Sequence, residues 1–198
     1  LGKSIRKGFS YAAQTEPIRS LLLISLVLGS SFAVMQISMP RVVEDVFERE
    51  AASAGTVLGA FGFGMLISSA FMANRTNVRH GRNMAICIGV GLGGGQLSLS
   101  FAPDVFIAIA VMLAWGMNAG IAMTSHRTVL QRNTPPEMMG RVMGLMMMGF
   151  MGGLPIGAGI AAALSRIMGP IDTMRTVGAV TIVIATSLTW RKSIRSVL

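Results

Sequence analysis

The sequence predicts an all-α integral membrane protein with six transmembrane helices and both termini in the cytoplasm. Three observations lead to this fold class. Of the 198 residues, 52% are apolar and 13% are charged, whereas an ordinary soluble domain carries about 25% charged residues. The charges stand in short blocks between apolar stretches of the length that crosses a bilayer as a helix. The number of positive charges also alternates from one block to the next.

Six stretches have this length, and we expect them at 20–39, 53–73, 84–101, 105–125, 142–164 and 171–190. The first should end at Pro40, because proline removes a helical hydrogen bond. The third and fourth are joined only by Ala102-Pro103-Asp104, which predicts a tight antiparallel hairpin. The predicted organisation is a cytoplasmic linker or amphipathic segment over 1–19, the six-helix transmembrane bundle over 20–190 and a cytoplasmic tail over 191–198.

The distribution of basic residues predicts the orientation. With six spans, both termini and the loops after the second and fourth spans lie on one side of the membrane. That side holds 13 of the 17 Lys and Arg residues, and the other holds only Arg41, Arg49, Arg166 and Arg175. Basic loops stay in the cytoplasm, so both termini should be cytoplasmic. The net charge of +9 follows from these flanking cations, and we expect no nucleic-acid partner, because basic nucleic-acid binders carry their charge on a water-exposed fold.

Close packing of the helices is predicted by glycines at four-residue spacing, since small residues let helices approach in lipid. The pairs are Gly55/Gly59, Gly89/Gly93, Gly91/Gly95 and Gly116/Gly120. In the fifth span the series Gly149, Gly153 and Gly157 surrounds Pro155, which should bend or loosen the helix. These four residues are therefore candidates for helix packing or for a hinge.

The uncharged polar residues of the spans are the candidates for lining an internal cavity. In the first span, Gln36 shares a face with Ser25 and Gly29. In the fourth, Trp115, Asn118 and Ser125 form a stripe opposite the Gly116/Gly120 face, which we expect to meet a neighbouring helix. The alternative for Gln36 or Asn118 is a hydrogen bond between helices.

No ionisable group is expected deep in the membrane, because every Asp, Glu, Lys and Arg falls in a loop or at a span end, and neither His80 nor His126 is deep. We predict no metal site and no cofactor. The series Met139, Met143, Met147 and Met151 offers thioethers of the kind that bind Cu(I), but without adjacent His or Cys a soft apolar wall or core filling is favoured.

Over essentially its whole length the chain resembles the major facilitator superfamily, in the branch that includes enterobactin exporters and macrolide-type efflux proteins, and three segments carry the resemblance. The opening Ser4 to Tyr11, with Pro17-Ile18-Arg19, is similar to the linker before the seventh helix of such transporters. The segment Gly116 to Gly120, followed by Gln131, Pro135, Glu137, Gly140 and Arg141, resembles the family's signature from the tenth to the eleventh helix. Arg79 to Asn83 resembles the end of the basic signature between paired helices, with Val78 in place of its Asp.

The resemblance implies that the chain is the C-terminal half of a twelve-helix transporter. The first, second, fourth and fifth spans would then line the cavity between the two halves. The candidates for a cytoplasmic gate are Arg79, Arg82, Gln131, Glu137 and Arg141, with a hypothetical Glu137–Arg141 salt bridge that biases the inward-facing against the outward-facing state. The implied partners are the lipid bilayer, a small-molecule substrate, and a missing N-terminal half or a second copy.

The function expected is secondary active efflux of a small, partly apolar molecule by alternating access, driven by an ion gradient and located in a bacterial inner membrane. No phosphate-binding loop is present that would indicate nucleotide-driven transport. The alternative is a half-size or truncated membrane protein that acts only as a dimer or has no transport activity. A membrane-embedded enzyme would need a nucleophile–base pair or a metal cluster, and neither is apparent. Substrate, direction and coupling ion do not follow from the sequence.

Overall fold

The computed structural model describes residues 10–50, 52–73, 83–84 and 86–189. The regular secondary structure of these residues is entirely helical, which confirms the all-α class. The elements are α2 (Glu16–Asp45), α3 (Ala52–Ala73), the π-helical turn η1 (Cys87–Gly91), α5 (Leu92–Leu99), α6 (Val105–Arg132), the 3-10 turn η2 (Pro136–Met138) and α7 (Met139–Thr189).

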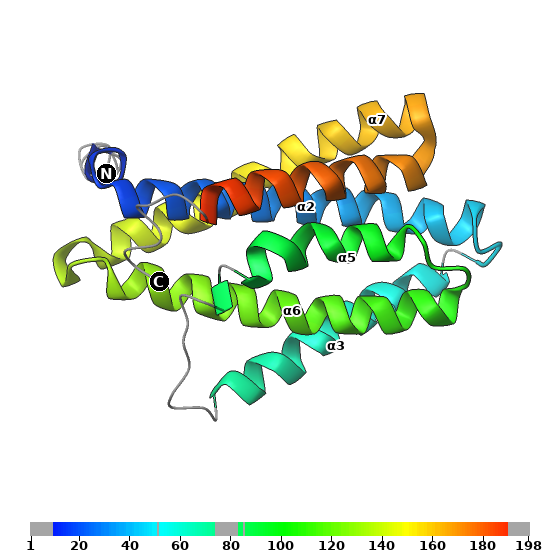
Figure 1. Cartoon of the computed structure of the whole chain (residues 1–198), viewed down its shortest axis with the longest axis horizontal. Helices are drawn as coiled ribbons and strands as arrows, with labels where there is room; N and C mark the ends of the chain where they lie inside the picture. The colour runs from blue at the N-terminus through cyan, green and yellow to red at the C-terminus, as the bar shows by residue number, and fades with distance from the viewer. Residues whose placement is uncertain (1–9, 51, 74–82, 85, 190–198) are drawn as a thin grey trace.

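Four helices of the described residues are long and apolar enough to cross a membrane. They cover Ile18–Asp45, Ala52–Ala73, Val105–Arg132 and Pro136–Leu188. The last of them contains α7, which folds back on itself at Gly169 (Figure 1). Gly169 has a φ of 81° and is followed by Pro170, so glycine supplies the left-handed backbone that ends one helix and proline starts the next.

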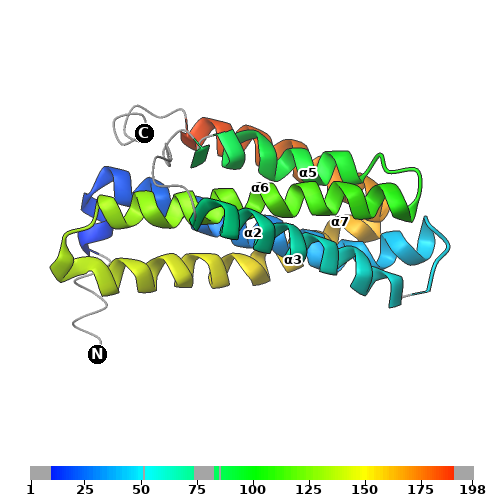
Figure 2. The same ribbon diagram turned by 90° about the horizontal axis from the view of Figure 1, so that it is seen from below.

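The fold-back divides α7 into two segments, 139–168 and 170–189, which occupy the predicted fifth and sixth spans. The predicted third span is occupied by residues 83–84 and 86, η1 and α5. The structure thus has about six helical segments, arranged as an elongated bundle (Figures 1 and 2).

Two predicted helix ends are wrong. The first helix does not stop at Pro40 but continues through it to Asp45, because Met39, Val42 and Val43 are all buried there. Burial of these side chains offsets the one hydrogen bond that proline removes. The fourth helix does not end near Ser125 but continues for two more turns to Arg132.

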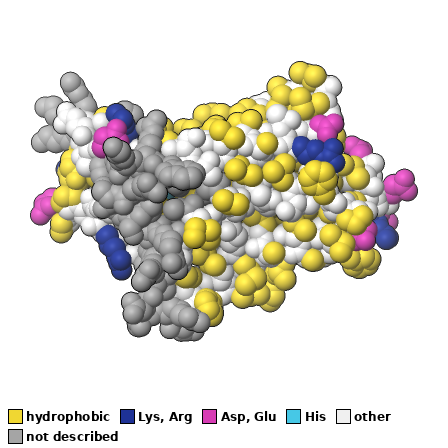
Figure 3. All heavy atoms as spheres, viewed as in Figure 1, with side chains coloured by type: hydrophobic (Ala, Val, Ile, Leu, Met, Phe, Trp, Pro, Cys, Tyr) yellow, Lys and Arg dark blue, Asp and Glu magenta, His cyan; other side chains and the backbone are white. Residues whose placement is uncertain are grey.

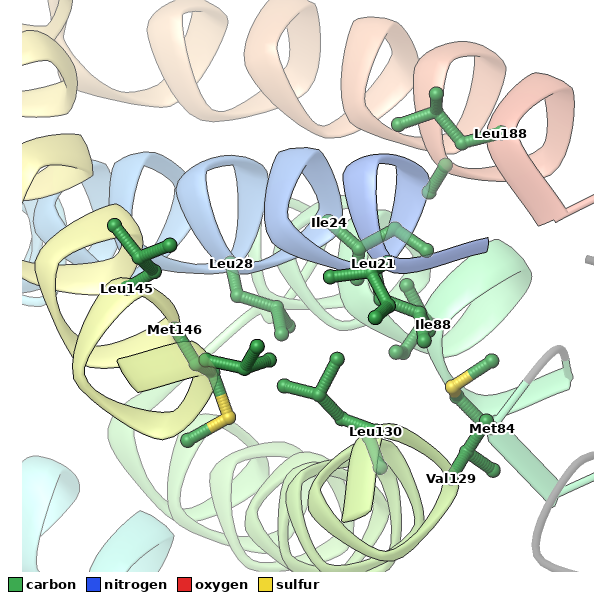
Figure 4. Packing of buried hydrophobic residues seen from close by; sticks show 14 of the residues in the cluster. Leu21, Ile24, Leu28, Met84, Ile88, Val129, Leu130, Leu145, Met146 and Leu188 are labelled. Carbon is green, nitrogen blue, oxygen red and sulfur yellow. The ribbon is translucent and has the colours of Figure 1, made fainter. Parts of the chain in front are cut away.

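Two pairs of helices form the body of the bundle. α2 packs mainly against α7, and α3 mainly against α6. η1 and α5 lie between them and contact α6 on one side and the second segment of α7 on the other, where Gly178 meets Gly93. Two clusters of buried apolar side chains fill the interior. Figure 4 shows one of them, in which Leu21, Ile24 and Leu28 of α2 face Leu130 of α6 and Met146 of α7.

The surface has the character of a lipid-facing wall. Large apolar side chains are exposed along α3, α6 and α7, among them Phe63, Phe106 and Val183. Figure 3 shows apolar side chains across the middle of one face, with the described charged side chains toward its two ends. Such a band is what a bilayer requires of a bundle of spanning helices.

The start of α2, the loop that contains η2 and the end of α7 lie at one end of the bundle (Figure 1). The loops between α2 and α3 and between α5 and α6 lie at the other, with the fold-back of α7. This is the arrangement that the predicted orientation requires. That the end where α2 starts and α7 ends faces the cytoplasm remains a prediction from the basic residues.

The predicted hairpin between the third and fourth spans is present. Asp104 is the N-cap of α6, and its Oδ1 accepts hydrogen bonds from the backbone N–H groups of Phe106 (2.8 Å) and Ile107 (2.9 Å). A carboxylate at this position satisfies amides that have no partner within the helix and also matches the positive end of its dipole.

Replacing Asp104 by alanine should therefore lower the free energy of unfolding by about 0.5–2 kcal/mol, whereas Asp104→Asn should retain most of the cap. Thermal unfolding in detergent would measure the difference. Asp172→Ala is the matched control, because Asp172 forms an exposed ion pair with Arg175, and such pairs contribute about 0–1 kcal/mol. Equal effects of the two alanine variants would contradict the capping role.

Candidate functional site

Four aromatic side chains from four helices meet in the interior of the bundle. Phe32 of α2 lies 6.0 Å from Phe61 of α3 and 6.1 Å from Phe150 of α7, measured between ring centroids. Phe61 in turn meets Trp115 of α6 edge to face, with centroids 5.5 Å apart. These separations and tilts are those of favourable aromatic pairs. The cluster therefore joins the first, second, fourth and fifth predicted spans at one point.

A cavity of about 220 Å³ adjoins these rings. Its lining residues are Leu28, Phe32, Phe61, Met65, Leu92, Trp115, Ala119, Met123 and Phe150. Every lining side chain is apolar or aromatic, and the two methionines can adapt their shape to different contents. Ligand sites in proteins are concave and mostly apolar with a few polar groups, so this aromatic cavity is the candidate site for a small apolar molecule.

Among the residues that line the cavity, only Trp115 has a side-chain N–H. It is 5% exposed, and its Nε1–H has no hydrogen-bond partner among the described residues. Gly95 makes room for the indole, because a Cβ at that position would overlap the ring. A buried donor without a partner is costly, so the indole N–H is free for an acceptor that reaches it.

Asn118, the second candidate on α6, lies against the neighbouring π-helical turn. Its Nδ2 donates a hydrogen bond to the Cys87 carbonyl oxygen at 3.1 Å, and Gly91 leaves the space for its amide. The structure therefore shows the hydrogen bond between helices that was the alternative for this residue. π-Helical turns are rare and occur frequently at functional sites, and Asn118 fixes this one to α6.

Asn118→Ala should lower the free energy of unfolding by about 1 kcal/mol, because it removes a hydrogen bond between two helices of a membrane bundle. Gln36→Ala is a suitable control, since Gln36 is exposed on α2, and exposed substitutions change stability by about 0.5 kcal/mol or less. Thermal denaturation in detergent measures both. A larger effect at Gln36 than at Asn118 would refute this assignment.

The remaining candidates for the cavity are separated from it. Gln36 is exposed on α2, and Ser125 is fully buried on α6 with no partner for its hydroxyl among the described residues. The expected Gly116/Gly120 face does meet a neighbouring helix: a Cβ at Gly116 would overlap the Phe61 carbonyl oxygen of α3, and one at Gly120 would overlap Ser68. By contrast, Gly55 and Gly59 have open space around them, so their predicted packing role is not met within the described residues.

Three of the five gate candidates lie at the end of the bundle where α2 starts and α7 ends. Gln131 is half-buried in the last turn of α6, and Glu137 and Arg141 are exposed on η2 and the first turn of α7. The guanidinium of Arg141 donates to the Met138 sulfur at 3.3 Å. Arg79 and Arg82 lie outside the described residues.

The three predicted packing glycines of α7 lie against α2. A Cβ at Gly153 would overlap the Leu26 carbonyl oxygen, and one at Gly157 would overlap that of Ser30. Gly149 is less crowded, with Leu22 and Ser25 at 3.3 Å from the position of a Cβ. Pro155 lies inside the helix between them. These contacts bring the two backbones together over two turns.

The sequence interpretation missed His126. Because α6 continues to Arg132, His126 lies inside the helix, six residues before its end, and is fully buried in the bundle. Its Nε2 lies 2.9 Å from the Ser25 Oγ of α2. Ser25 and His126 each lie on a polar stripe of their helix. A search for polar residues on two such stripes that could pair between adjacent helices would have identified them.

The chain matches the family described as "transmembrane secretion effector" over residues 1–197. No curated protein matches the chain.

Proposed function

Because the chain belongs to the transmembrane secretion effector family, a branch of the major facilitator superfamily, we propose that it is the C-terminal half of a secondary active transporter. The family consists of membrane transporters and not of enzymes. The molecule exported in this proposal is small and partly apolar, and it crosses by alternating access in a bacterial inner membrane. Both termini lie in the cytoplasm, as the basic residues predict.

The aromatic cavity is the observation that supports this function best. Phe32, Phe61, Trp115 and Phe150 come from α2, α3, α6 and α7, so a ligand among them touches four helices at once. Alternating access moves helices relative to a site near the middle of the membrane. A site formed by four separate helices changes whenever they move, which is what a transporter needs and a rigid binding protein does not.

The proposed transporter also requires a second six-helix bundle, either an N-terminal half or a second copy of this chain. The outer face of α3 supports this, because Gly55, Gly59 and Gly62 have open space beside them and small residues allow a further helix to approach closely. The mass of the full-length protein in detergent distinguishes the cases. A monomer with only six spans would favour the alternative of a truncated protein without transport.

The energy source in this proposal is an ion gradient. The Glu137–Arg141 pair, four residues apart at the predicted cytoplasmic end, would control access from that side. The membrane insertion of the chain does not depend on this pair, since both residues are exposed at the end of the bundle.

Drug susceptibility tests the function directly. The full-length protein, expressed in a bacterial strain that lacks its own exporters, should raise the inhibitory concentration of small ring-containing apolar compounds. It should leave the inhibitory concentration of small hydrophilic antibiotics unchanged. If no apolar compound in a broad panel becomes less toxic while the protein is present in the membrane, the proposed export function is wrong.

A further inference from the structure

The contact between His126 and Ser25 is the least explained polar feature of the bundle. Both side chains are almost completely inaccessible, His126 at 0% and Ser25 at 1% exposure. They belong to α6 and α2, two helices that share few other contacts. An ionisable side chain inside a membrane-crossing helix is costly and usually functional.

The surroundings of His126 are apolar. Ala122, Val129 and Leu130 lie on the same face of α6, four residues before and three and four residues after it, and all three belong to the buried cluster that includes Leu21 and Ile24. Figure 4 shows Leu130 directed toward the α2 side chains of this cluster and Val129 close to Met84. A charged imidazole could not be hydrated there, so the histidine of this conformation is neutral.

The hydrogen bonds of Ser25 allow a tautomer of His126 with one open nitrogen. Ser25 Oγ lies 3.2 Å from the Leu21 carbonyl oxygen and 2.9 Å from His126 Nε2. When the hydroxyl donates to Leu21, it accepts the hydrogen bond of Nε2–H, and Nδ1 keeps its lone pair. Nδ1 has no partner among the described residues. A buried basic nitrogen is thus left open.

No charged side chain of the described residues forms a salt bridge with His126; the two salt bridges there are Arg19–Glu16 and Arg175–Asp172. On the elements around His126, the ionisable groups at the same end of the bundle are Glu16 and Arg19 on α2, Arg127 and Arg132 on α6, Glu137 on η2 and Arg141 on α7, and all of them are exposed. The Cys87 thiol on η1 is half-buried. The remaining charged groups of α2 and α7 lie at the opposite end: Arg41, Glu44, Asp45, Arg166, Asp172 and Arg175.

We propose that His126 is a proton-binding site of the transporter, at which proton uptake by Nδ1 is coupled to the separation of α6 from α2. The proposal rests on the proposed function, since it names the ion that the transporter uses. A proton passes from water to the Nδ1 lone pair, an N–H bond forms, and the imidazole becomes a cation. The cation needs hydration, and the Ser25 contact denies water access.

Thermodynamic linkage then couples the two events. The neutral histidine stabilises the closed contact, and the protonated form stabilises the open one. By linkage, protonation favours the open contact by the same factor by which opening the contact raises the proton affinity of His126. Ser25 and His126 are each six residues from an arginine at the same end, Arg19 and Arg132, which is about 9 Å along a helix. Water therefore needs to enter by only a short distance.

Proton movement in everted membrane vesicles tests the proposal, with Nile red as the probe because it is neutral, ring-containing and has acceptor oxygens. Respiration acidifies the vesicle interior, and an acid-sensitive dye reports it. Adding Nile red to vesicles with the wild-type full-length protein should change the proton gradient. His126→Gln should abolish this change, because glutamine can bond to Ser25 but cannot bind a proton. Phe106→Ala, at an exposed position of the same helix, should keep it.

The outcomes separate the two proposals. If the wild type exports Nile red from cells but does not move protons, or if His126→Gln moves them as the wild type does, the proton site is wrong and the transporter stands. If the wild type exports no apolar compound, the proposed function fails.

A spectroscopic measurement avoids dependence on the folding of His126→Gln. The protein has two histidines, so His80→Gln with isotope-labelled histidine leaves His126 as the single imidazole signal in lipid nanodiscs. Its Nδ1 should be unprotonated at neutral pH and should take up a proton reversibly in acid while the protein stays folded. An imidazole that becomes protonated only when the protein unfolds would overturn the proposal.

Discussion

Gly153→Leu is expected to prevent stable folding of the bundle. A Cβ at this position would overlap the Leu26 carbonyl oxygen and come within 2.8 Å of the Ser30 nitrogen. Both atoms belong to the backbone of α2, so no side-chain rotation can relieve the overlap, and α7 must move away along its main contact. Overpacking costs about 1–3 kcal/mol in well-packed interiors, and we expect a loss at or above the top of this range.

The adjacent glycine provides the control. Gly152 has nothing within 4 Å of a Cβ position and is exposed, so Gly152→Leu should change stability by no more than about 0.5 kcal/mol. The yield of monodisperse protein after detergent extraction, together with its thermal midpoint, compares the two variants. If Gly153→Leu is as stable as Gly152→Leu, α2 and α7 do not pack as described.

Trp115→Ala should reduce Nile red export by roughly tenfold or more. Truncation removes an aromatic wall of the cavity together with the only side-chain N–H among its lining residues, and loss of contact with one large buried side chain costs about 1.5–3 kcal/mol. A cost of about 1.4 kcal/mol is already a factor of ten. Trp115→Phe should have a smaller effect, since it keeps a ring and loses the N–H donor.

Phe106→Ala is the control for this series, because Phe106 lies on the same helix but is 73% exposed and is not among the residues that line the cavity. Export rates are normalised to the amount of protein in the membrane, and thermal stability is measured for each variant. Wild-type export by a folded Trp115→Ala variant would exclude the aromatic cavity as the path of the substrate.

The sequence predicted the helical segments well, because apolar length and charge position are strong signals in a membrane protein. Their ends were harder to predict. Pro40 was expected to end the first helix, but Met39, Val42 and Val43 bury themselves against α3 and adjacent helices, and tertiary packing outweighs the local preference of proline. The end of α6 was misplaced for a related reason, since Val129 and Leu130 are core residues beyond the apolar run.

The candidate site was predicted only in part, because it depends on which helices are neighbours. Trp115 was identified from its place on a polar stripe, but Phe32, Phe61 and Phe150 carry no sequence signal that separates them from lipid-facing phenylalanines such as Phe63 and Phe106. Helical periodicity shows which residues share a face. It does not show which face meets which partner, and His126 was missed for the same reason.

The four-residue spacing of glycines predicted where helices could approach closely. It could not distinguish glycines that pack against a helix from glycines with open space beside them. Gly116 and Gly120 pack on α3, while Gly55 and Gly59 have the same spacing and open surroundings. The difference lies in the neighbour and not in the motif. In the proposed complete transporter, the open glycines are free for a helix of the second bundle.

Energised efflux is the most direct test of the central claim that this bundle forms half of an exporter for small apolar molecules. Cells that produce the full-length protein are loaded with Nile red while their membrane gradient is collapsed, and the gradient is then restored. The account predicts that dye leaves these cells faster than it leaves cells that produce Trp115→Ala at equal amounts, and that the difference disappears when the gradient is collapsed again. Equal dye loss from both, with the wild-type protein folded in the membrane, would contradict it.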